Sequence, residues 1–512
     1  MAEARIVIDR DFQVGPVPRR LFGSFVEHMG RCVYTGIYEP AHPSADEHGF
    51  RTDVLELVKE MGPTVVRYPG GNFVSGYRWE DGVGPKDRRP NRLDGAWHTI
   101  EPNTFGLHEF VEWAKKADVE VMEAINLGTR GVEEARALVE YANHPRGTYW
   151  SDMRRANGAQ EPFGIKLWCL GNELDGPWQI GHKTADEYGR LAQETAKAMK
   201  LVDRDIELVA VGSSNRQMPT FGDWEHTVLK HTYEEVDYIS MHAYYYEDNG
   251  DAASFLAEAV DMDAFIDGVV ATIDAVKAAG KHRKQVNISF DEWNVWYQRG
   301  LDGEDQPHNV AKAGWRVAPR VIEDTYSVTD AVVVGTLLHS LLRHGDRVTI
   351  ANQAQLVNVI APIRAEENGP AWRQTSFWPF ARMSKLATGE ILHLKVDSTQ
   401  TPTEKFGDVD LVDAAATWDE ETGKLALFLA NRSLSEDAEI SLDLRGLAVS
   451  GISSAELLTV PEGGDRHTAN TLHHREAVGL TPLTSIGVED GVVRGSLPAL
   501  SWAAIQLDVD RV

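Results

Sequence analysis

The chain has 512 residues, of which 42% are hydrophobic and 25% charged, a composition typical of a soluble globular protein with a large and a smaller domain. Its 78 acidic residues outnumber 51 basic residues, and the net charge of −27 argues against nucleic acid or an anionic membrane surface as a partner. Two cysteines, Cys32 and Cys169, are too few for a disulfide scaffold or a structural zinc site, so both are expected to be small core residues.

The N-terminal segment Met1–Arg10 is charged and contains no apolar run long enough for a signal peptide. No stretch of the sequence has the length of a membrane-spanning helix. Together with the small number of thiols, these features predict a cytoplasmic protein without a membrane partner.

A first β-rich run, Arg5–Ile8, precedes a long region in which β-rich runs alternate with amphipathic helical stretches. A helix is expected over Asp53–Met61, where apolar residues recur at i, i+3, i+4 and i+7. Another is expected after Thr184, which begins the residue pattern of a capping box. The eight β-rich runs of this region are Leu21–Val26, Thr64–Tyr68, Val119–Ile125, Ile165–Leu170, Ile206–Val211, Tyr238–His242, Gln285–Phe290 and Val348–Ala351.

Eight alternating strand and helix units favour a closed (β/α)₈ barrel, the TIM barrel, over an open doubly wound sheet. The open sheet is the alternative, but no strand is followed by a glycine-rich phosphate-binding turn. After about Thr388, short strand-like runs separated by turns replace the helical pattern, which predicts a β-sandwich. The expected domains are residues 1–18, a strand that joins the sandwich, residues 19–387, the barrel, and residues 388–512, the C-terminal β-sandwich.

Polar residues stand at the carboxyl ends of several predicted barrel strands, where the active sites of this fold lie. Asn172-Glu173 follows the fourth strand, and Glu292, in the sequence Asp-Glu-Trp-Asn, follows the seventh. Two carboxylates across a barrel mouth suit glycosidic cleavage, in which one protonates the leaving oxygen and the other faces the anomeric carbon. An isolated Asn-Glu pair is a weak signal, but the two motifs together at these strand ends are a strong one.

Four motifs in this order resemble those of glycoside hydrolase family 51, whose typical members are intracellular α-L-arabinofuranosidases. The resemblance extends over nearly the whole chain, barrel and C-terminal sandwich alike. The motifs are Phe22-Gly23-Ser24-Phe25-Val26-Glu27-His28, Arg67-Tyr68-Pro69-Gly70-Gly71-Asn72-Phe73, Gly171-Asn172-Glu173 and Asp291-Glu292-Trp293-Asn294.

The resemblance implies a retaining double displacement, with Glu292 as the nucleophile and Glu173 as the acid and then the base. The two roles need opposite tuning, since Glu173 must be protonated near neutral pH while Glu292 is ionised. Arg67 and Tyr244 match positions near the nucleophile that favour its ionised form, and His242 is expected to support them. The residues expected to bind the sugar or its leaving group are Glu27, Asn72, Trp97, Asn172, Tyr244, Trp296 and Gln355.

Several of these residues also have a purely structural interpretation. Glu27 could form a salt bridge at the barrel rim, and Trp97, in a predicted loop, could serve packing alone. His28 and His242 could be core histidines with satisfied hydrogen bonds. The strand-end position favours function for Glu27.

Two other functions are alternatives. A metal hydrolase on the same barrel is disfavoured because the sequence has no His-x-His or His-Glu-x-x-His pair and its strand-end acids are mixed with amides and aromatics. A catalytically silent sugar-binding module is disfavoured by the two intact carboxylates. We therefore expect no cofactor and no metal, and an arabinose-containing oligosaccharide as the substrate. The resemblance alone implies a homo-oligomer, a hexamer or trimer, while linkage preference, endo-action and side activity on β-xylosides stay open.

Overall fold

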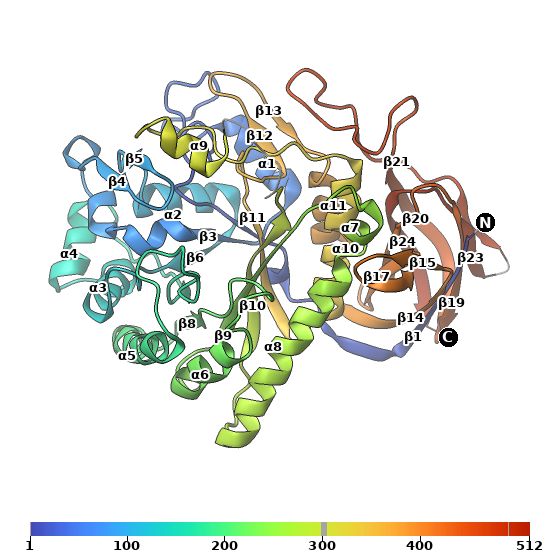
Figure 1. Ribbon diagram of the computed structural model, residues 1–512, viewed down its shortest axis with the longest axis horizontal. Coiled ribbons are helices and arrows are strands. Elements are labelled where there is room, and N and C mark those ends of the chain that lie inside the picture. The colour runs from blue at the N-terminus through green and yellow to red at the C-terminus, as the bar shows by residue number, and fades with distance from the viewer. Residues whose placement is uncertain (1, 298–304, 490, 512) are drawn as a thin grey trace.

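A computed structural model describes residues 2–297, 305–489 and 491–511. Its larger part is a closed barrel of parallel strands in the order β10-β11-β2-β3-β6-β7-β8-β9, so the predicted TIM barrel is confirmed (Figure 1). The barrel strands are β2 (Gly23–Phe25), β3 (Val65–Tyr68), β6 (Glu120–Ala124), β7 (Leu167–Cys169), β8 (Glu207–Ala210), β9 (Tyr238–Tyr245), β10 (Asn287–Val295) and β11 (Val348–Ala354).

At least one helix follows each barrel strand and covers the outside of the barrel (Figure 1). The first buries the predicted apolar face and ends at Gly62, whose φ of 76° lies in the left-handed region that favours glycine. The predicted capping box is present at Thr184, whose side chain accepts a hydrogen bond from the backbone N–H of Glu187. The helices are α1 (Thr52–Met61), α2 (Leu107–Ala117), α3 (Val132–Asn143), α4 (Tyr149–Ala156), α5 (Ala185–Val202), α6 (Asp223–Thr232), α7 (Ala252–Leu256), α8 (Ala259–Gly280), α9 (Pro307–Lys312), α10 (Val328–Arg343) and α11 (Phe377–Leu386).

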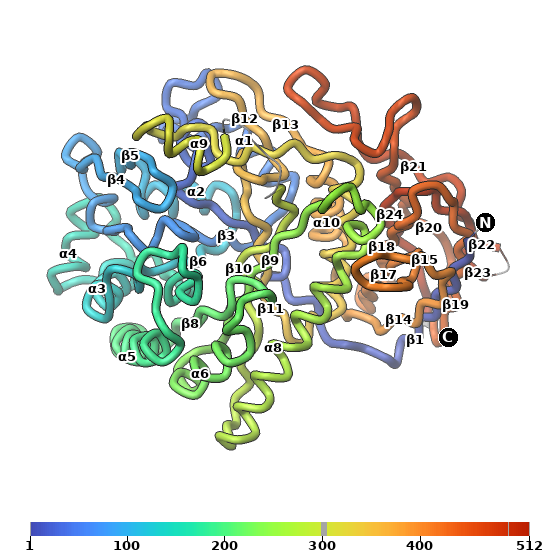
Figure 2. The backbone as a smooth tube through the Cα atoms, in the orientation of Figure 1, coloured from blue at the N-terminus to red at the C-terminus, as the bar shows by residue number. Residues whose placement is uncertain are grey.

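The C-terminal domain is one ten-stranded sheet that curls until β20 contacts β19 and β22. Its apolar side chains pack inside the curl and form the core of this domain. The N-terminal strand β1 pairs with β14 and β19 within this sheet, as Figure 2 shows by its blue tube among orange and red strands. The strands are β1 (Ala2–Pro16), β14 (Glu390–Ser398), β17 (Val412–Asp419), β18 (Lys424–Asn431), β19 (Ala438–Arg445), β20 (Leu447–Thr459), β21 (Thr481–Pro482), β22 (Ile486–Glu489), β23 (Val492–Leu497) and β24 (Ser501–Arg511).

The helix α10 packs against both domains and is buried along almost its whole length. Gly335 allows the indole of Trp502 to approach, because a Cβ at this position would lie 2.3 Å from the Trp502 ring. Trp502 also donates a hydrogen bond of 3.1 Å to His339. The same domain contacts the barrel through the hairpin of β15 (Gln400–Thr403) and β16 (Gly407–Asp410), which packs against α7.

Two further hairpins lie on the barrel side, β4 (Arg92–Asp94) with β5 (Thr99–Glu101) and β12 (Ile363–Ala365) with β13 (Ala371–Arg373). Cys32 and Cys169 are both buried free thiols, as predicted. In the part of the chain that the structure describes, no helix combines the length and apolar character needed to span a bilayer.

Candidate active site

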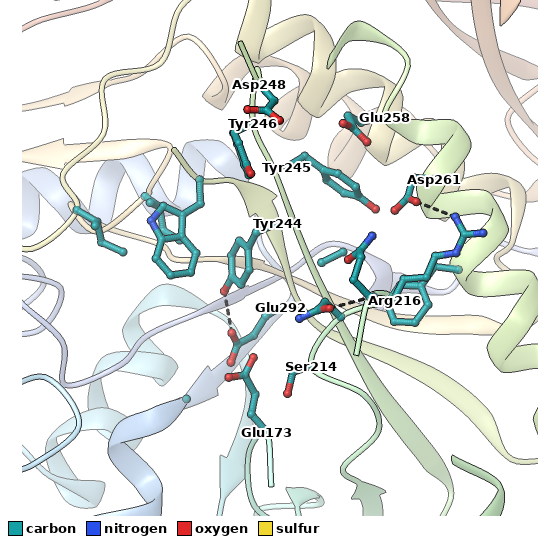
Figure 3. Close-up of a pocket in the computed structure, with 18 of the residues that line it drawn as sticks. Glu173, Ser214, Arg216, Tyr244, Tyr245, Tyr246, Asp248, Glu258, Asp261 and Glu292 are labelled. Carbon is teal, nitrogen blue, oxygen red and sulfur yellow. Dashed lines mark hydrogen bonds and ion pairs between the residues drawn. The ribbon is translucent and has the colours of Figure 1, made fainter. Parts of the chain in front are cut away.

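Glu173 and Glu292 face one cavity of about 1100 Å³ at the carboxyl ends of the barrel strands (Figure 3). Glu292 lies within β10, whereas Glu173 lies in the loop after β7 with a backbone φ of 45°. A residue with a side chain rarely adopts this left-handed conformation, and such strain is concentrated at functional sites. One oxygen of each carboxylate and one ring nitrogen of His242 lie within 4.8 Å of one another.

Glu292 is buried and is held by two donors. Nη1 of Arg67 donates a hydrogen bond of 2.7 Å to its Oε1, and the hydroxyl of Tyr244 donates one of 2.7 Å to its Oε2. Burial opposes ionisation, but His242, Arg67 and Tyr244 outweigh it and lower the pKa of Glu292 below its ordinary value. The site therefore keeps Glu292 as an anion that is hydrogen-bonded at both oxygens.

His242 connects the two carboxylates. Its Nδ1 lies 2.9 Å from Oε1 of Glu173 and 3.6 Å from Oε2 of Glu292. Burial disfavours a charged ring, but the two carboxylates outweigh that effect and raise the pKa of His242. On its other oxygen, Glu173 accepts a hydrogen bond of 2.7 Å from the indole N–H of Trp178. His242 is thus a hydrogen-bond partner of Glu173, as well as a buried histidine.

Glu27 lines the same cavity and follows the first barrel strand, β2. It accepts hydrogen bonds from the backbone N–H of Phe73 (2.9 Å), from the indole of Trp97 (2.9 Å) and from the amide of Gln355 (3.1 Å). A Cβ at Gly71 would lie 2.7 Å from Oε2 of Glu27, so the glycine makes room for this carboxyl group. Burial and the nearby Glu292 raise the pKa of Glu27 to about 8. A pKa raised this far favours the protonated form of Glu27 at neutral pH.

Asn72 and Asn172, which follow the second and fourth barrel strands, form a chain of hydrogen bonds with Arg67. Nη2 of Arg67 donates to Oδ1 of Asn172 at 2.7 Å, and Nδ2 of Asn172 donates to Oδ1 of Asn72 at 3.1 Å. Asn72 lines the cavity, whereas Asn172, predicted to bind a sugar hydroxyl, is buried and is not among the lining residues. Its contacts indicate that Asn172 positions Arg67 and Asn72.

The other predicted residues lie as follows. Trp296 lines the cavity and packs edge-on against Tyr244, with ring centroids 5.1 Å apart. His28 is not among the residues that line the cavity. Its two ring nitrogens lie 2.9 Å from Glu101 and 2.9 Å from Tyr68. These contacts agree with the alternative that His28 is a core histidine with satisfied hydrogen bonds. The cavity is lined by the predicted residues Glu27, Asn72, Trp97, Glu173, Tyr244, Glu292, Trp296 and Gln355.

Glu173, His242 and Glu292 are close enough together to hold a metal ion. Their ligand atoms, however, already have partners, since Arg67 and Tyr244 bind both oxygens of Glu292 and His242 contacts Glu173. The guanidinium of Arg67 also supplies the positive charge that would otherwise come from a cation. We therefore assign no metal to this site.

Trp178 and the far part of the cavity escaped the sequence prediction. Trp178 lies five positions after Glu173, and an aromatic residue so close to a predicted catalytic acid was a usable signal. The far part had no such signal, because it is built from side chains distant in sequence. Its residues include Arg216, Tyr245, Glu258, Asp261 and Lys405.

Comparison with known proteins identifies relatives over almost the whole chain. The family model described as the alpha-L-arabinofuranosidase 1 domain matches residues 57–251. The model described as the alpha-L-arabinofuranosidase C-terminal domain matches residues 291–501. Both halves of the chain thus match domains of the same kind of protein.

An intracellular exo-alpha-(1→5)-L-arabinofuranosidase of Streptomyces lividans is 54% identical over 508 residues, which cover 99% of this chain and 75% of that protein. An exo-alpha-(1→6)-L-arabinofuranosidase of Bifidobacterium longum is 53% identical, over 99% of this chain and 98% of that protein. The solved structure of a family 51 alpha-L-arabinofuranosidase from Bifidobacterium longum has a TM-score of 0.93 at 47% identity and covers 99% of this chain and 100% of that chain. The arabinose complex of the Thermotoga maritima enzyme has a TM-score of 0.86 at 34% identity, with 99% of each chain covered. This chain therefore belongs to glycoside hydrolase family 51, the family of these α-L-arabinofuranosidases.

Proposed function

We propose that the protein is a retaining exo-α-L-arabinofuranosidase that removes terminal α-L-arabinofuranosyl residues from the non-reducing ends of arabino-oligosaccharides. Glu292 is the nucleophile and Glu173 the acid and then the base. The observation that carries this assignment is the close pair of carboxylates, with oxygens within 4.8 Å of each other. Retaining enzymes have carboxyl groups about 5–5.5 Å apart, whereas inverting enzymes need about 6.5–9.5 Å to admit a water molecule.

In the first step, an oxygen of Glu292 forms a bond to the anomeric carbon while the bond from that carbon to the leaving oxygen breaks. Glu173 gives its proton to the leaving oxygen and becomes a carboxylate. In the second step, Glu173 takes a proton from water, the water oxygen bonds to the anomeric carbon, and the ester to Glu292 breaks. The lowered pKa of Glu292 supports the nucleophilic role, because a protonated carboxyl group cannot attack.

The wall formed by Glu27, Trp97 and Gln355 supports exo-action. These three side chains are joined by hydrogen bonds. We propose that they bound the end of the cavity that takes the terminal sugar. The protonated carboxyl group of Glu27 is suited to exchange hydrogen bonds with a sugar hydroxyl. Asn72 supplies an amide at the same wall.

Several relatives carry the word intracellular in their names, among them the enzymes of Streptomyces lividans and Bacillus subtilis. We therefore propose a cytoplasmic enzyme that acts on short oligosaccharides. The predicted homo-oligomer stays a prediction that the size of the purified protein in solution will test.

The test is an NMR time course of 4-nitrophenyl α-L-arabinofuranoside hydrolysis, which identifies the anomer that forms before mutarotation. Initial α-arabinofuranose that disappears in Glu292→Ala supports substrate, retention and nucleophile together. Glu47→Gln, a change at an exposed carboxylate remote from the cavity, is the control and should behave like the wild type. Initial β-arabinofuranose would contradict retention, and an active Glu292→Ala would contradict the nucleophile assignment.

A further inference from the structure

Asp175 lies two positions after Glu173 in the loop between β7 and α5. We propose that Asp175 is a positioning residue, which acts through Glu173 by holding the loop of this acid within reach of the leaving oxygen. Asp175 is buried and is not among the residues that line the cavity, so it acts on the substrate only through other residues. The inference rests on the proposed function, because it takes Glu173 as the acid and then the base.

The backbone at Glu173 needs support from its surroundings. Its φ is 45°, and that of Gly171, two positions earlier, is 103°. Glycine adopts such angles at little cost, whereas a residue with a Cβ is strained there and persists only where the surrounding contacts hold it. The N–H of Gly176 donates a hydrogen bond of 2.9 Å to the carbonyl of Glu173, but this bond lies within the loop itself. Contacts with other loops must therefore hold the turn in place.

Both carboxylate oxygens of Asp175 bind one residue of the loop after β8. The backbone N–H of Ser214 donates a hydrogen bond of 2.9 Å to Oδ2 of Asp175, and the hydroxyl of Ser214 donates another to Oδ1. Ser214 lines the cavity together with Glu173 (Figure 3). The pair of Asp175 and Ser214 thus joins the loop of the acid to the neighbouring loop beside the cavity.

The loop after β8 is itself anchored just before Ser214. The N–H of Ser213 donates a hydrogen bond of 2.7 Å to Glu225 on α6. The N–H of Gly212 donates one of 3.0 Å to the hydroxyl of Ser240 on β9. Glu225 and Ser240 are both buried. Ser214 therefore offers a fixed partner, because the two residues before it are tied to an outer helix and to the next barrel strand.

Glu173 lies between two residues that fix the chain to other elements. On one side, Asn172 accepts a hydrogen bond of 2.7 Å from Arg67. On the other side, among the described residues, Asp175 is the first whose side chain forms a hydrogen bond with another loop. Further contacts of this kind come later in the loop, such as the bond of 3.0 Å from Lys183 to the carbonyl of Gly128. Asp175 is thus the nearest support on the carboxyl side of the acid.

The carboxyl group of Glu173 is oriented by Trp178 and His242, at 2.7 and 2.9 Å. These contacts place it correctly only while the backbone of Glu173 stays where it is. A general acid works within hydrogen-bond reach, about 2.6–3.2 Å, and a displacement of about 1 Å can cost about 100-fold in rate. A looser loop should therefore weaken proton donation in particular.

The charge of Asp175 also lies close to the acid. Burial and the nearby Glu173 raise the pKa of Asp175, against the opposing effects of its bonds from Ser214 and of nearby His242. A change at Asp175 can therefore act through charge as well as through position. Ser214→Ala separates the two effects, because it removes one hydrogen bond and leaves the carboxyl group of Asp175 in place.

The first test compares kcat/KM for arabinobiose, whose leaving group needs a proton, with kcat/KM for a dinitrophenyl arabinofuranoside, whose leaving group needs none. In Asp175→Asn we expect the value for arabinobiose to fall about 10- to 100-fold and the value for the aryl substrate to change little. The reason is that an amide offers Ser214 only one acceptor in place of two. Ser214→Ala should lower the same ratio by a smaller factor. A purely structural role would slow both substrates alike.

The second test is a double-mutant cycle with Glu173→Ala. If Asp175 acts through Glu173, then Asp175→Asn should not slow the hydrolysis of arabinobiose further once Glu173 is alanine. The same fall in kcat/KM in both backgrounds would show that Asp175 acts independently of the acid.

Asp237→Asn is the matched control. Asp237 also accepts a hydrogen bond from a backbone N–H of a neighbouring segment, that of Leu208 at 2.9 Å. It lies before β9, at the amino ends of the barrel strands and away from the cavity. Its ratio of the two substrates should stay at the wild-type value. The thermal midpoint of each variant is measured to show that it is folded.

An unchanged ratio in folded Asp175→Asn would overturn the proposal. A fall in Asp175→Asn that Ser214→Ala does not share would assign the effect to charge, and would overturn positioning. If Asp175→Asn does not fold, Ser214→Ala decides the question by the same ratio and the same cycle. Normal hydrolysis of arabinobiose by Glu173→Ala would instead overturn the proposed acid, and this inference with it, so the two failures are distinguishable.

Discussion

The hydroxyl of Tyr244 donates a 2.7 Å hydrogen bond to Oε2 of Glu292, and it does so from the neighbouring strand β9. This bond is one of the interactions that lower the pKa of Glu292 against the opposing effect of burial. The other oxygen of Glu292, Oε1, accepts a hydrogen bond from the buried guanidinium of Arg67. The ionised state of Glu292 thus depends on contacts between strands that are far apart in the sequence.

Tyr244→Phe should lower kcat/KM about 10- to 100-fold at neutral pH, since a hydrogen bond to a charged group contributes about 1.5–3 kcal/mol. The bond lowers the pKa of Glu292, so its loss raises that pKa, and the acid limb of the kcat/KM profile should move to higher pH. The pH–rate profile with an aryl arabinofuranoside checks this. Tyr149→Phe, at an exposed ring on α4, is the control, and an acid limb that does not move would contradict the role of Tyr244.

Glu173→Ala should slow hydrolysis by a factor that depends on the leaving group of the substrate. Loss of general acid help should reduce turnover of arabino-oligosaccharides by about 10²–10⁴-fold, and much less for an aryl substrate whose leaving group needs no proton. Paired kinetics of arabinobiose and of a dinitrophenyl arabinofuranoside measure the difference. Normal hydrolysis of arabinobiose by the variant would show that Glu173 is not the acid.

Glu27→Gln should change how stability depends on pH. Folding raises the pKa of Glu27 from an ordinary value of 4.5 to about 8, because of burial and the neighbouring Glu292. Between these two pH values the folded protein holds a proton that the unfolded chain has lost, so this group makes the wild type less stable as pH rises. The variant lacks that effect, and its thermal midpoint relative to the wild type should increase from pH 5 to pH 8. A constant difference across this range would mean that the pKa of Glu27 is not raised.

Asp413→Ala should destabilise the junction of the two domains. On β17, Asp413 contacts His339 at 2.8 Å and Arg343 at 2.9 Å, both on α10. Burial opposes its charge, but Arg343 and His339 outweigh burial and lower the pKa of Asp413. Loss of one member of a buried ionic group costs about 3–5 kcal/mol. We expect a lower midpoint of urea unfolding at neutral pH.

The sign of the pH effect provides an internal control for Asp413. A carboxyl group with a lowered pKa in the folded state stabilises the protein above its ordinary pKa of 3.8, and that contribution is lost as pH falls. The gap in unfolding midpoint between wild type and variant should therefore narrow below about pH 4. A gap that persists unchanged in acid would indicate lost packing as the cause.

Much of the fold follows from local patterns in the sequence. Alternation of β-rich runs with amphipathic helices identified every barrel strand, because each helix must bury one face and each parallel strand both. The predicted ends of the strands were less accurate than their existence and order. For example, β10 continues to Val295 because it pairs with β9 as far as Tyr245, and such pairing is not visible in either segment alone.

The sequence by itself determined the barrel, the β-rich C-terminal domain and the strand-end positions of Glu173 and Glu292, since periodicity and residue type decide these. Tertiary structure alone decided that Asn172 is buried against Arg67, that Trp178 contacts Glu173, and that Arg216 and Lys405 border one cavity. The physical reason is the range of the interactions involved. The pattern of a helix or strand can be recognised from residues that are near in sequence. A cavity wall depends on how distant segments pack and where their side chains then meet.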